Sequence, residues 1–126
     1  MVGIVIVSHS QKLAEGVAEL AKMMAADAPV VPAGGLDDGT FGTSFEKIST
    51  AIDSVYSDDG VVILMDMGSA VMTAEMVIEN MPDRKIRMLD CPLVEGAVVA
   101  AIGSSANQSV EEIAEAVQDA ASEKKL

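Results

Sequence analysis

The sequence predicts a single three-layer α/β/α domain built on a mostly parallel central sheet of about four strands. Two short runs, residues 3–7 and 61–65, contain no polar side chain, as is typical of parallel strands covered on both faces. Longer stretches with hydrophobic residues at helical spacing separate the extended runs, so strands alternate with helices. Such alternation favours parallel strands joined by right-handed crossovers. The chain is long enough for one core, and we expect residues 1–126 to form a single domain.

The first strand leads almost directly into the first helix. Residues 3–7 are predicted to form the strand, and hydrophobic residues three or four positions apart then predict a helix over about 11–26. Ser8 and Gln11 have the spacing of a capping box, which would let this helix begin at His9.

The next strand is predicted to lie at an edge of the sheet. Residues 29–33 contain two prolines, which edge strands tolerate better than central strands do. Residues 34–44 form a long, polar, glycine-rich loop. Thr43 or Ser44 can then cap a second helix, because hydrophobic residues recur at helical spacing over 45–55.

The second half of the chain repeats the alternation. Residues 61–65 predict a second fully buried strand, which is followed by a helix over about 69–80. Residues 86–90 predict a fourth strand, and 92–103 the helix after it. A final amphipathic helix begins near Val110.

Composition and charge exclude several classes of function. The formal net charge of −12, from 8 basic and 20 acidic residues, argues against binding to a nucleic-acid backbone. Only 2% of the residues are aromatic, which also argues against a platform for stacking bases. A surface this acidic favours a basic protein partner, although solubility alone is the plainer explanation of the charge.

The single cysteine and the single histidine limit the possible metal and disulfide chemistry. Cys91 is alone, so no intramolecular disulfide framework can form, and a reducing compartment fits best. With one cysteine and one histidine, we expect no metal site. The apolar run at the amino terminus is too short to span a membrane and lacks a preceding basic segment. We therefore expect a cytoplasmic protein with no membrane partner.

Two buried strands are followed by side chains capable of chemistry. His9 follows the strand at 3–7, and Asp66 follows the strand at 61–65. In parallel sheets, ligands gather at the carboxyl ends of the strands. If the two strands are neighbours, a carboxylate bonded to one imidazole nitrogen leaves the other nitrogen free as a nucleophile. The alternatives are that His9 merely packs or caps and that Asp66 caps the next helix.

The surroundings of these two residues favour a phosphoryl group as the species that the histidine attacks. Helices are predicted to begin beside both residues, and the first N–H groups of a helix bind anions. Nearby hydroxyl groups, and glycines that let backbone N–H groups come close, add further hydrogen-bond donors. The expected phosphoryl-binding residues are Ser8, Ser10, Gly42, Thr43, Ser44, Gly68 and Ser69. For the glycine-rich loop, an ordinary long turn is the alternative.

Nucleotide-binding motifs are absent. Gly34 and Gly39 have the glycine spacing of a P-loop, but Thr40 and Phe41 follow where lysine and serine are needed. No dinucleotide fingerprint follows the first strand. A small domain of this kind fits a phosphoryl relay better than a complete kinase.

Five segments keep the order and spacing of a known family from residue 3 to about residue 103. They are Ile4 to Ser10, Ala33 to Gly39, Phe41 to Ser44, Met65 to Ala70 followed by Ala74 and Glu75, and Cys91 to Ala97. This series resembles the phosphotransfer subunit of bacterial dihydroxyacetone kinase, a family related to the mannose-type enzyme IIA domains of the phosphoenolpyruvate-dependent sugar phosphotransferase system. Cys91 departs from the alanine expected at its position, which is a change to another small residue.

The resemblance implies specific roles and partners. It places the family's phosphohistidine on His9 and its strand-end aspartate on Asp66. It implies that Nε2 of His9 accepts phosphate from the histidine phosphocarrier protein and passes it to ADP in the nucleotide-binding kinase subunit, which phosphorylates dihydroxyacetone. It also implies that the chain binds no cofactor of its own, since the partner subunit holds ADP or ATP and only a transient phosphoryl group resides on His9. Family members look like homodimers, so a homodimer is expected.

One other function fits the same fold. A regulatory domain would be phosphorylated slowly on His9 and would be read by another protein as a signal of the state of the sugar phosphotransferase system. The persistence of the phosphoryl group distinguishes this function from a relay.

Overall fold

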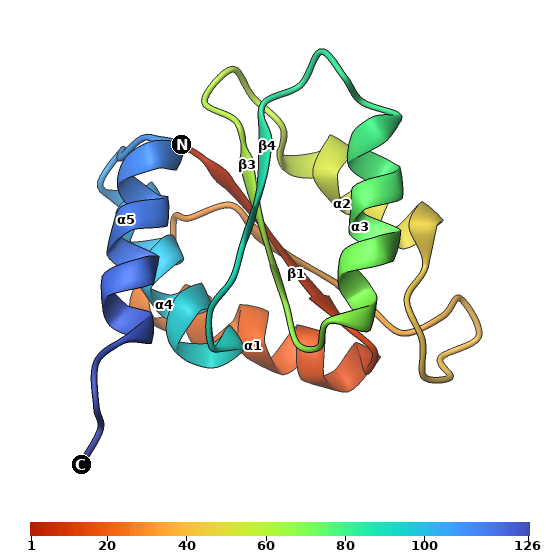
Figure 1. The fold of residues 1–126 in the computed structure, drawn as a ribbon, viewed down its shortest axis with the longest axis horizontal. Coiled ribbons are helices and arrows are strands. Elements are labelled where there is room, and N and C mark those ends of the chain that lie inside the picture. The colour runs from red at the N-terminus through yellow and green to blue at the C-terminus, as the bar shows by residue number, and fades with distance from the viewer.

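All four strands run parallel in the computed structural model, which describes residues 1–126 (Figure 1). The strands are β1 (Gly3–Ser8), β2 (Val30–Gly34), β3 (Val61–Met65) and β4 (Ile86–Leu89), in the order β2-β1-β3-β4. The helices are α1 (Gln11–Met24), α2 (Phe45–Val55), α3 (Ser69–Glu79), α4 (Leu93–Ser105) and α5 (Val110–Ala121). The predicted alternation of strands and helices is confirmed.

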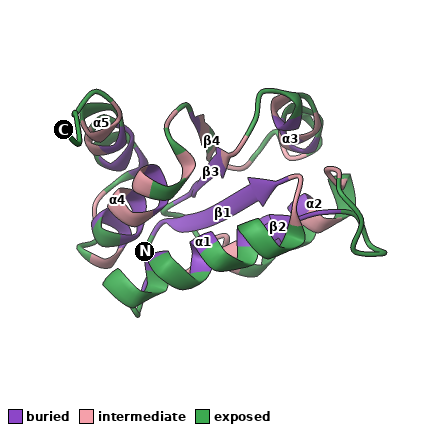
Figure 2. Ribbon diagram, turned by 90° about the horizontal axis from the view of Figure 1, so that it is seen from below, coloured by how far each residue is buried: buried purple, intermediate pink, exposed green.

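Helices cover both faces of the sheet and complete the predicted three layers. On one face, α1, α4 and α5 pack against side chains that include Ile4 and Ile6 of β1. On the other face, α2 and α3 pack against side chains that include Val5 and Val7. Figure 2 shows β1 buried between these layers, which explains why its sequence contains no polar residue before its last position.

The strand order brings the residues that follow β1 and β3 together. Val7 lies opposite Met65 of β3 on one side and opposite Ala33 of β2 on the other. The carboxyl ends of these strands lie at one edge of the sheet, where α1 and α3 begin (Figure 1). The condition that the two buried strands be neighbours is therefore met.

The first helix begins later than the capping-box spacing predicts. Ser10 has extended backbone dihedrals, and its hydroxyl accepts the N–H of Leu13 at 3.2 Å, so Ser10 is the N-cap and α1 begins at Gln11. The prediction that the helix could begin at His9 under a Ser8 cap was wrong. Ser8 is the last residue of β1, and tertiary contacts use its hydroxyl.

The strand that contains the prolines lies at the sheet edge, as predicted. β2 pairs only with β1, and Pro32 presents no N–H that a further strand could use. The five helices pack on the sheet, and none is both long enough and apolar enough to cross a membrane.

Candidate functional site

His9 and Asp66 are hydrogen-bonded to each other at the carboxyl edge of the sheet. The N–H of Asp66 donates to the carbonyl of Val7 at 3.2 Å, which continues the β1–β3 ladder by one residue. Nδ1 of His9 lies 3.0 Å from Oδ1 of Asp66, and the backbone N–H of His9 donates to Oδ2 at 3.1 Å. The two side chains are 22% and 12% exposed, so most of the pair is shielded from solvent.

Four donors surround the Asp66 carboxylate. Besides the two groups of His9, the Ser8 hydroxyl donates to Oδ2 at 2.8 Å and the Met67 N–H donates to Oδ1 at 2.8 Å. Partial burial acts to raise the pKa of Asp66. The hydrogen bonds from Ser8, His9 and Met67 outweigh it and hold the pKa below its ordinary value. Asp66 is therefore a carboxylate at neutral pH.

An ionised Asp66 determines which imidazole nitrogen carries the proton. A carboxylate only accepts hydrogen bonds, so Nδ1 of His9 must be the donor at the 3.0 Å contact. In the neutral ring, Nε2 then holds a free lone pair. The hydroxyl of Ser69 lies 2.7 Å from Nε2 and donates to it. The ring is thus oriented with its nucleophilic nitrogen toward the start of α3.

The glycine-rich loop is tied to the same site through its backbone. The Gly42 N–H donates to the carbonyl of His9 at 2.9 Å, and the Gly35 N–H donates to the carbonyl of Ser8 at 3.1 Å. Gly42 has φ +147°, and a Cβ at this position would lie 2.9 Å from the side chain of Leu36. A side chain at position 42 would therefore be strained and would have to displace Leu36.

The remaining predicted phosphoryl-binding residues have other partners. Ser10 caps α1, and Ser44 caps α2 by accepting the N–H of Lys47. The hydroxyls of Thr43 and Thr73 lie 2.9 Å apart and link the loop to α3. Among the predicted hydroxyl groups, Ser69 alone contacts Nε2.

The start of α3 faces the imidazole without a side-chain cap. Gly68 occupies the N-cap position and makes no side-chain cap hydrogen bond. The N–H groups of Ala70 and Val71 donate to the carbonyls of Met67 and Gly68, whereas those of Gly68 and Ser69 donate to no backbone carbonyl. The N-terminal end of a helix also carries a partial positive charge. This end of α3 is therefore suited to an anion placed at Nε2.

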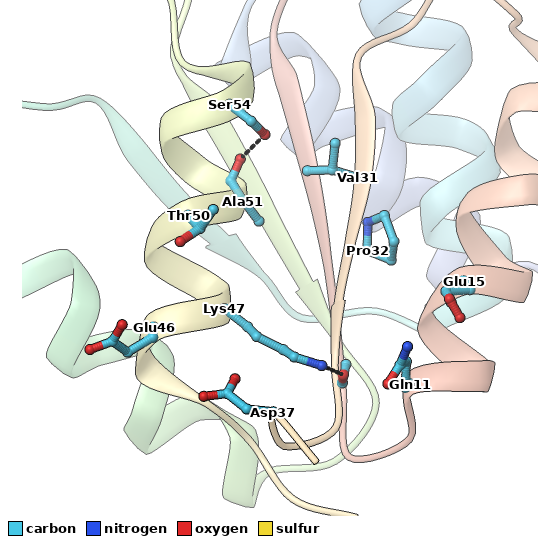
Figure 3. Close-up of a pocket in the computed structure, with 11 residues that line it drawn as sticks. Gln11, Glu15, Val31, Pro32, Asp37, Glu46, Lys47, Thr50, Ala51 and Ser54 are labelled. Atoms are coloured by element: carbon cyan, nitrogen blue, oxygen red, sulfur yellow. Dashed lines mark hydrogen bonds between the residues drawn. The ribbon is translucent and has the colours of Figure 1, made fainter. Parts of the chain in front are cut away.

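A groove of about 550 Å³ lies beside the site but does not contain it (Figure 3). It follows β2 between α1 and α2, and neither His9 nor Asp66 lines it. Lys47 crosses the groove and donates to the carbonyl of Gly34 at 3.1 Å. This contact occupies a carbonyl of the open strand edge with a charged donor, which helps to keep other strands from pairing there. No pattern in the sequence predicted this contact or the contact of Thr73 with Thr43.

The site combines an imidazole whose Nε2 holds a lone pair, a carboxylate bonded to Nδ1, and a hydroxyl donor from Ser69. No group of three or more histidine, cysteine, aspartate or glutamate side chains lies close enough together to hold a metal ion. The arrangement resembles other nucleophilic sites in which a third group orients the base or nucleophile. It can form a covalent bond from Nε2 to an electrophilic phosphorus atom.

Comparison with known proteins identifies the family. A family profile described as EIIA-man, PTS system fructose IIA component, matches residues 3–122, which include the His9–Asp66 site. The chain belongs to the mannose-type enzyme IIA family. The resemblance and the fold class predicted from the sequence are thereby confirmed.

Several curated proteins are similar to this enzyme IIA chain. A protein of Listeria innocua named as the phosphoryl donor subunit of a PEP-dependent dihydroxyacetone kinase is 38% identical over 90% of this chain and 94% of its own length. A Lactococcus lactis protein named as the phosphotransferase subunit of a PTS-dependent dihydroxyacetone kinase is 36% identical, over 92% and 93%. The Escherichia coli donor subunit is 38% identical over 90% of this chain. The chain spans only 25% of the length of that relative.

Solved structures share the fold of this enzyme IIA chain. The crystal structure of EF1359, a protein of unknown function, has a TM-score of 0.83 at 28% identity, and the match covers 99% of this chain and 98% of that one. An EIIA component of the phosphotransferase system from Streptococcus agalactiae has a TM-score of 0.72 at 18% identity, over 96% and 92%. The second likeness concerns the fold alone.

Proposed function

We propose that this chain is the phosphoryl donor subunit of a phosphoenolpyruvate-dependent dihydroxyacetone kinase and that His9 carries the phosphoryl group. The observation that supports this most directly is the His9 ring, whose Nδ1 is bonded to an ionised Asp66 while Nε2 faces the start of α3. The names of relatives that match nearly their full length agree with this function.

The proposed chemical step is an in-line phosphoryl transfer. The Nε2 lone pair of His9 attacks phosphorus, and the bond from phosphorus to the donor's nitrogen breaks, with its electron pair remaining on the donor. The proton on Nδ1 stays in place, so the phosphorylated ring is cationic. Asp66, 3.0 Å from Nδ1, stabilises that cation. Transfer to an acceptor is the reverse process with a different partner.

The phosphoryl oxygens are held mainly by the start of α3 in this proposal. Ser69 donates its hydroxyl to Nε2 in the free protein, and the same hydroxyl can turn to a phosphoryl oxygen after transfer. The N–H groups of Gly68 and Ser69, which donate to no backbone carbonyl, supply further donors. Ser8 and Gly42 act indirectly, because they hold Asp66 and the His9 backbone in position.

The partners follow from the resemblance and remain proposals for this chain. The donor is the histidine phosphocarrier protein, and the acceptor is ADP in the nucleotide-binding kinase subunit. The chain itself supplies no cofactor other than the transient phosphoryl group. We also propose that the chain is a homodimer, which sedimentation at several concentrations tests directly.

A phosphorylation assay tests the function. The protein is incubated with phosphoenolpyruvate, enzyme I and the histidine phosphocarrier protein, and the product is examined for one acid-labile, base-stable phosphate. We expect His9 to be labelled, His9→Gln to remain unlabelled but folded, and the ADP-loaded kinase subunit to discharge the label.

Each other outcome has a defined meaning. Labelling of His9→Gln contradicts the assignment of the nucleophile. A label on His9 that the kinase subunit fails to discharge contradicts the relay and favours the regulatory domain. No label on the wild-type protein contradicts both functions.

A further inference from the structure

The start of α3, which presents Ser69 to the imidazole, is anchored to the core by small side chains. The buried residues in its first turns are Ala70 and Ala74, whereas the larger Val77 and Ile78 pack near its far end. A methyl side chain buries little apolar surface, and the free energy of burial scales with that surface. Polar contacts therefore have a large part in fixing where the start of α3 lies.

Two side-chain hydrogen bonds join α3 to distant parts of the chain. The Ser69 hydroxyl lies 2.7 Å from Nε2 of His9, and the Thr73 hydroxyl lies 2.9 Å from that of Thr43. No other hydrogen bond links α3 to a residue far away in the sequence. Ser69 and Thr73 are four residues apart, so both lie on the same face of the helix.

The Thr43–Thr73 contact completes a circuit of contacts that begins and ends at His9. Thr43 follows Gly42, whose N–H donates to the carbonyl of His9 at 2.9 Å. The circuit runs from the imidazole through Ser69 and Thr73 to Thr43, and returns through Gly42 to the His9 backbone. A helix can pivot about one contact, whereas two contacts about 6 Å apart on one face restrict that rotation.

Phosphorylation breaks one of these two hydrogen bonds. In the proposed step, the Nε2 lone pair forms the bond to phosphorus, and the bond from phosphorus to the donor breaks with its electron pair left on the donor. Nε2 then has no lone pair with which to accept the Ser69 hydroxyl. The Thr43–Thr73 contact is the remaining hydrogen bond that ties α3 to the site.

We propose that Thr43 and Thr73 are positioning residues, whose paired hydroxyls keep the start of α3 beside Nε2 while the phosphoryl group is bound there. The proposal rests on the proposed function. The pair acts through the donors of Gly68 and Ser69 and does not itself touch the reacting nitrogen. This role differs from the direct contact with phosphoryl oxygens that we expect for Thr43 from the sequence alone.

Valine substitutions remove this hydrogen bond and little else. Valine has the shape of threonine without the hydroxyl, so Thr43→Val and Thr73→Val each delete one partner of the pair. The double variant deletes both partners of the same bond, and Thr73→Ser retains a hydroxyl. The matched control is Thr50→Val, because Thr50 is an exposed threonine of α2 that faces the groove beside β2.

Two phosphoryl donors separate positioning from docking. The phosphorylated histidine phosphocarrier protein must dock, whereas phosphoramidate is small and reaches Nε2 without docking. Since the threonine pair acts on the site, we expect both donors to reveal the same defect. With the protein donor, the loss should fall on kcat and leave KM within about twofold of wild type.

Each single valine variant should be labelled about three- to tenfold more slowly than wild type, which corresponds to the loss of one neutral hydrogen bond. The double variant should be within about twofold of the single variants, because the two substitutions remove one shared contact. Thr73→Ser and Thr50→Val should stay within about twofold of wild type with both donors.

Amide hydrogen exchange measures the anchoring of α3 independently of labelling. The N–H groups of Ala70 and Val71 donate to carbonyls within the first turn, so their exchange reports on the start of the helix. We expect Thr73→Val to speed this exchange. The increase should be larger in the phosphorylated protein, where the Ser69–Nε2 bond no longer contributes.

Failure of this proposal is distinguishable from failure of the proposed function. Wild-type protein that neither donor labels would contradict the function, whereas normal labelling of both single valine variants would overturn the positioning role while the function stands. Losses that multiply in the double variant would also overturn it, because Thr43 and Thr73 would then act separately. An equal loss in Thr73→Ser, or unchanged exchange in Thr73→Val, would likewise exclude the hydroxyl pair as the anchor.

Discussion

Replacement of Asp66 by asparagine removes one charge from the site and keeps the shape of the side chain. Asp66 accepts hydrogen bonds from four donors, two at each oxygen. An amide has one acceptor oxygen and one NH₂ group, so it cannot satisfy all four. If its oxygen takes the place of Oδ1, the NH₂ group meets the backbone N–H of His9. If its oxygen takes the place of Oδ2, the NH₂ group meets the Met67 N–H and the His9 ring, which must then move its proton to Nε2.

The expected loss of phosphorylation rate follows from the hydrogen bonds that the substitution removes. The Asp66→Asn substitution leaves the phosphorylated imidazolium without a carboxylate partner at Nδ1, and a hydrogen bond to a charged group is worth about 1.5–3 kcal/mol. At about 1.36 kcal/mol for each factor of ten, we expect phosphorylation of His9 to slow by about 10- to 150-fold. Labelling by phosphoramidate should slow comparably, since the defect is in the chemistry and not in docking.

Initial rates of labelling and nitrogen NMR together test this reasoning. The NMR spectrum of the wild-type protein should show a neutral imidazole protonated at Nδ1, and Asp66→Asn should increase the form protonated at Nε2. Asp119→Asn is the matched control, because Asp119 is exposed and lies in α5, away from the site. Unchanged rates in Asp66→Asn, alongside an inactive His9→Gln, would refute the role assigned to the carboxylate.

Three further predictions concern single groups. Ser69→Ala should slow phosphorylation of His9 by about two- to tenfold, which corresponds to the loss of one neutral hydrogen bond. The unfolding midpoint should not change, because the Ser69 hydroxyl caps no helix, and a clear loss of stability would contradict this. Because the pKa of Asp66 is lowered in the native state, its stabilising contribution is present above the ordinary aspartate pKa of about 3.9 and is lost as the pH falls through the lowered value. Urea unfolding at a series of pH values should therefore show a steeper acid loss for wild type than for Asp66→Asn, and parallel curves would exclude this linkage. Burial and the nearby charge of Asp90 raise the pKa of Cys91 to about 11, so a thiol reagent at about pH 8 should react far more slowly with the native than with the unfolded protein.

The local features of the fold were predictable because they depend on neighbouring residues. Unbroken apolar runs predicted β1 and β3, and the prolines placed β2 at an edge. The order of the strands was not predictable in the same way, because it depends on how each crossover returns to the sheet. The sequence argument therefore needed the adjacency of β1 and β3 as a condition, which the structure supplies.

The site was predictable as a pair of residues but not as a network. His9 and Asp66 follow buried strands, which is a signal that a sequence carries. The Ser8 hydroxyl could either cap α1 or bond to a residue far away in the sequence. Spacing alone favoured the cap, whereas in the structure the hydroxyl donates to Asp66, 58 residues away. The Thr43–Thr73 contact spans 30 residues, and neither side chain has a pattern that identifies the other. Such contacts depend on tertiary positions that no local pattern encodes.

The proposed function places donor and acceptor at one atom, Nε2 of His9, and this limits how tightly either partner should bind. In that relay each partner must leave before the other can reach Nε2. With a typical turnover of about 10 s⁻¹ and an association rate constant of about 10⁶ M⁻¹ s⁻¹, each complex must have a Kd of about 10 μM or weaker. A stronger complex would slow the cycle by blocking the next encounter. In a relay with one attachment point, throughput therefore favours partners that separate readily.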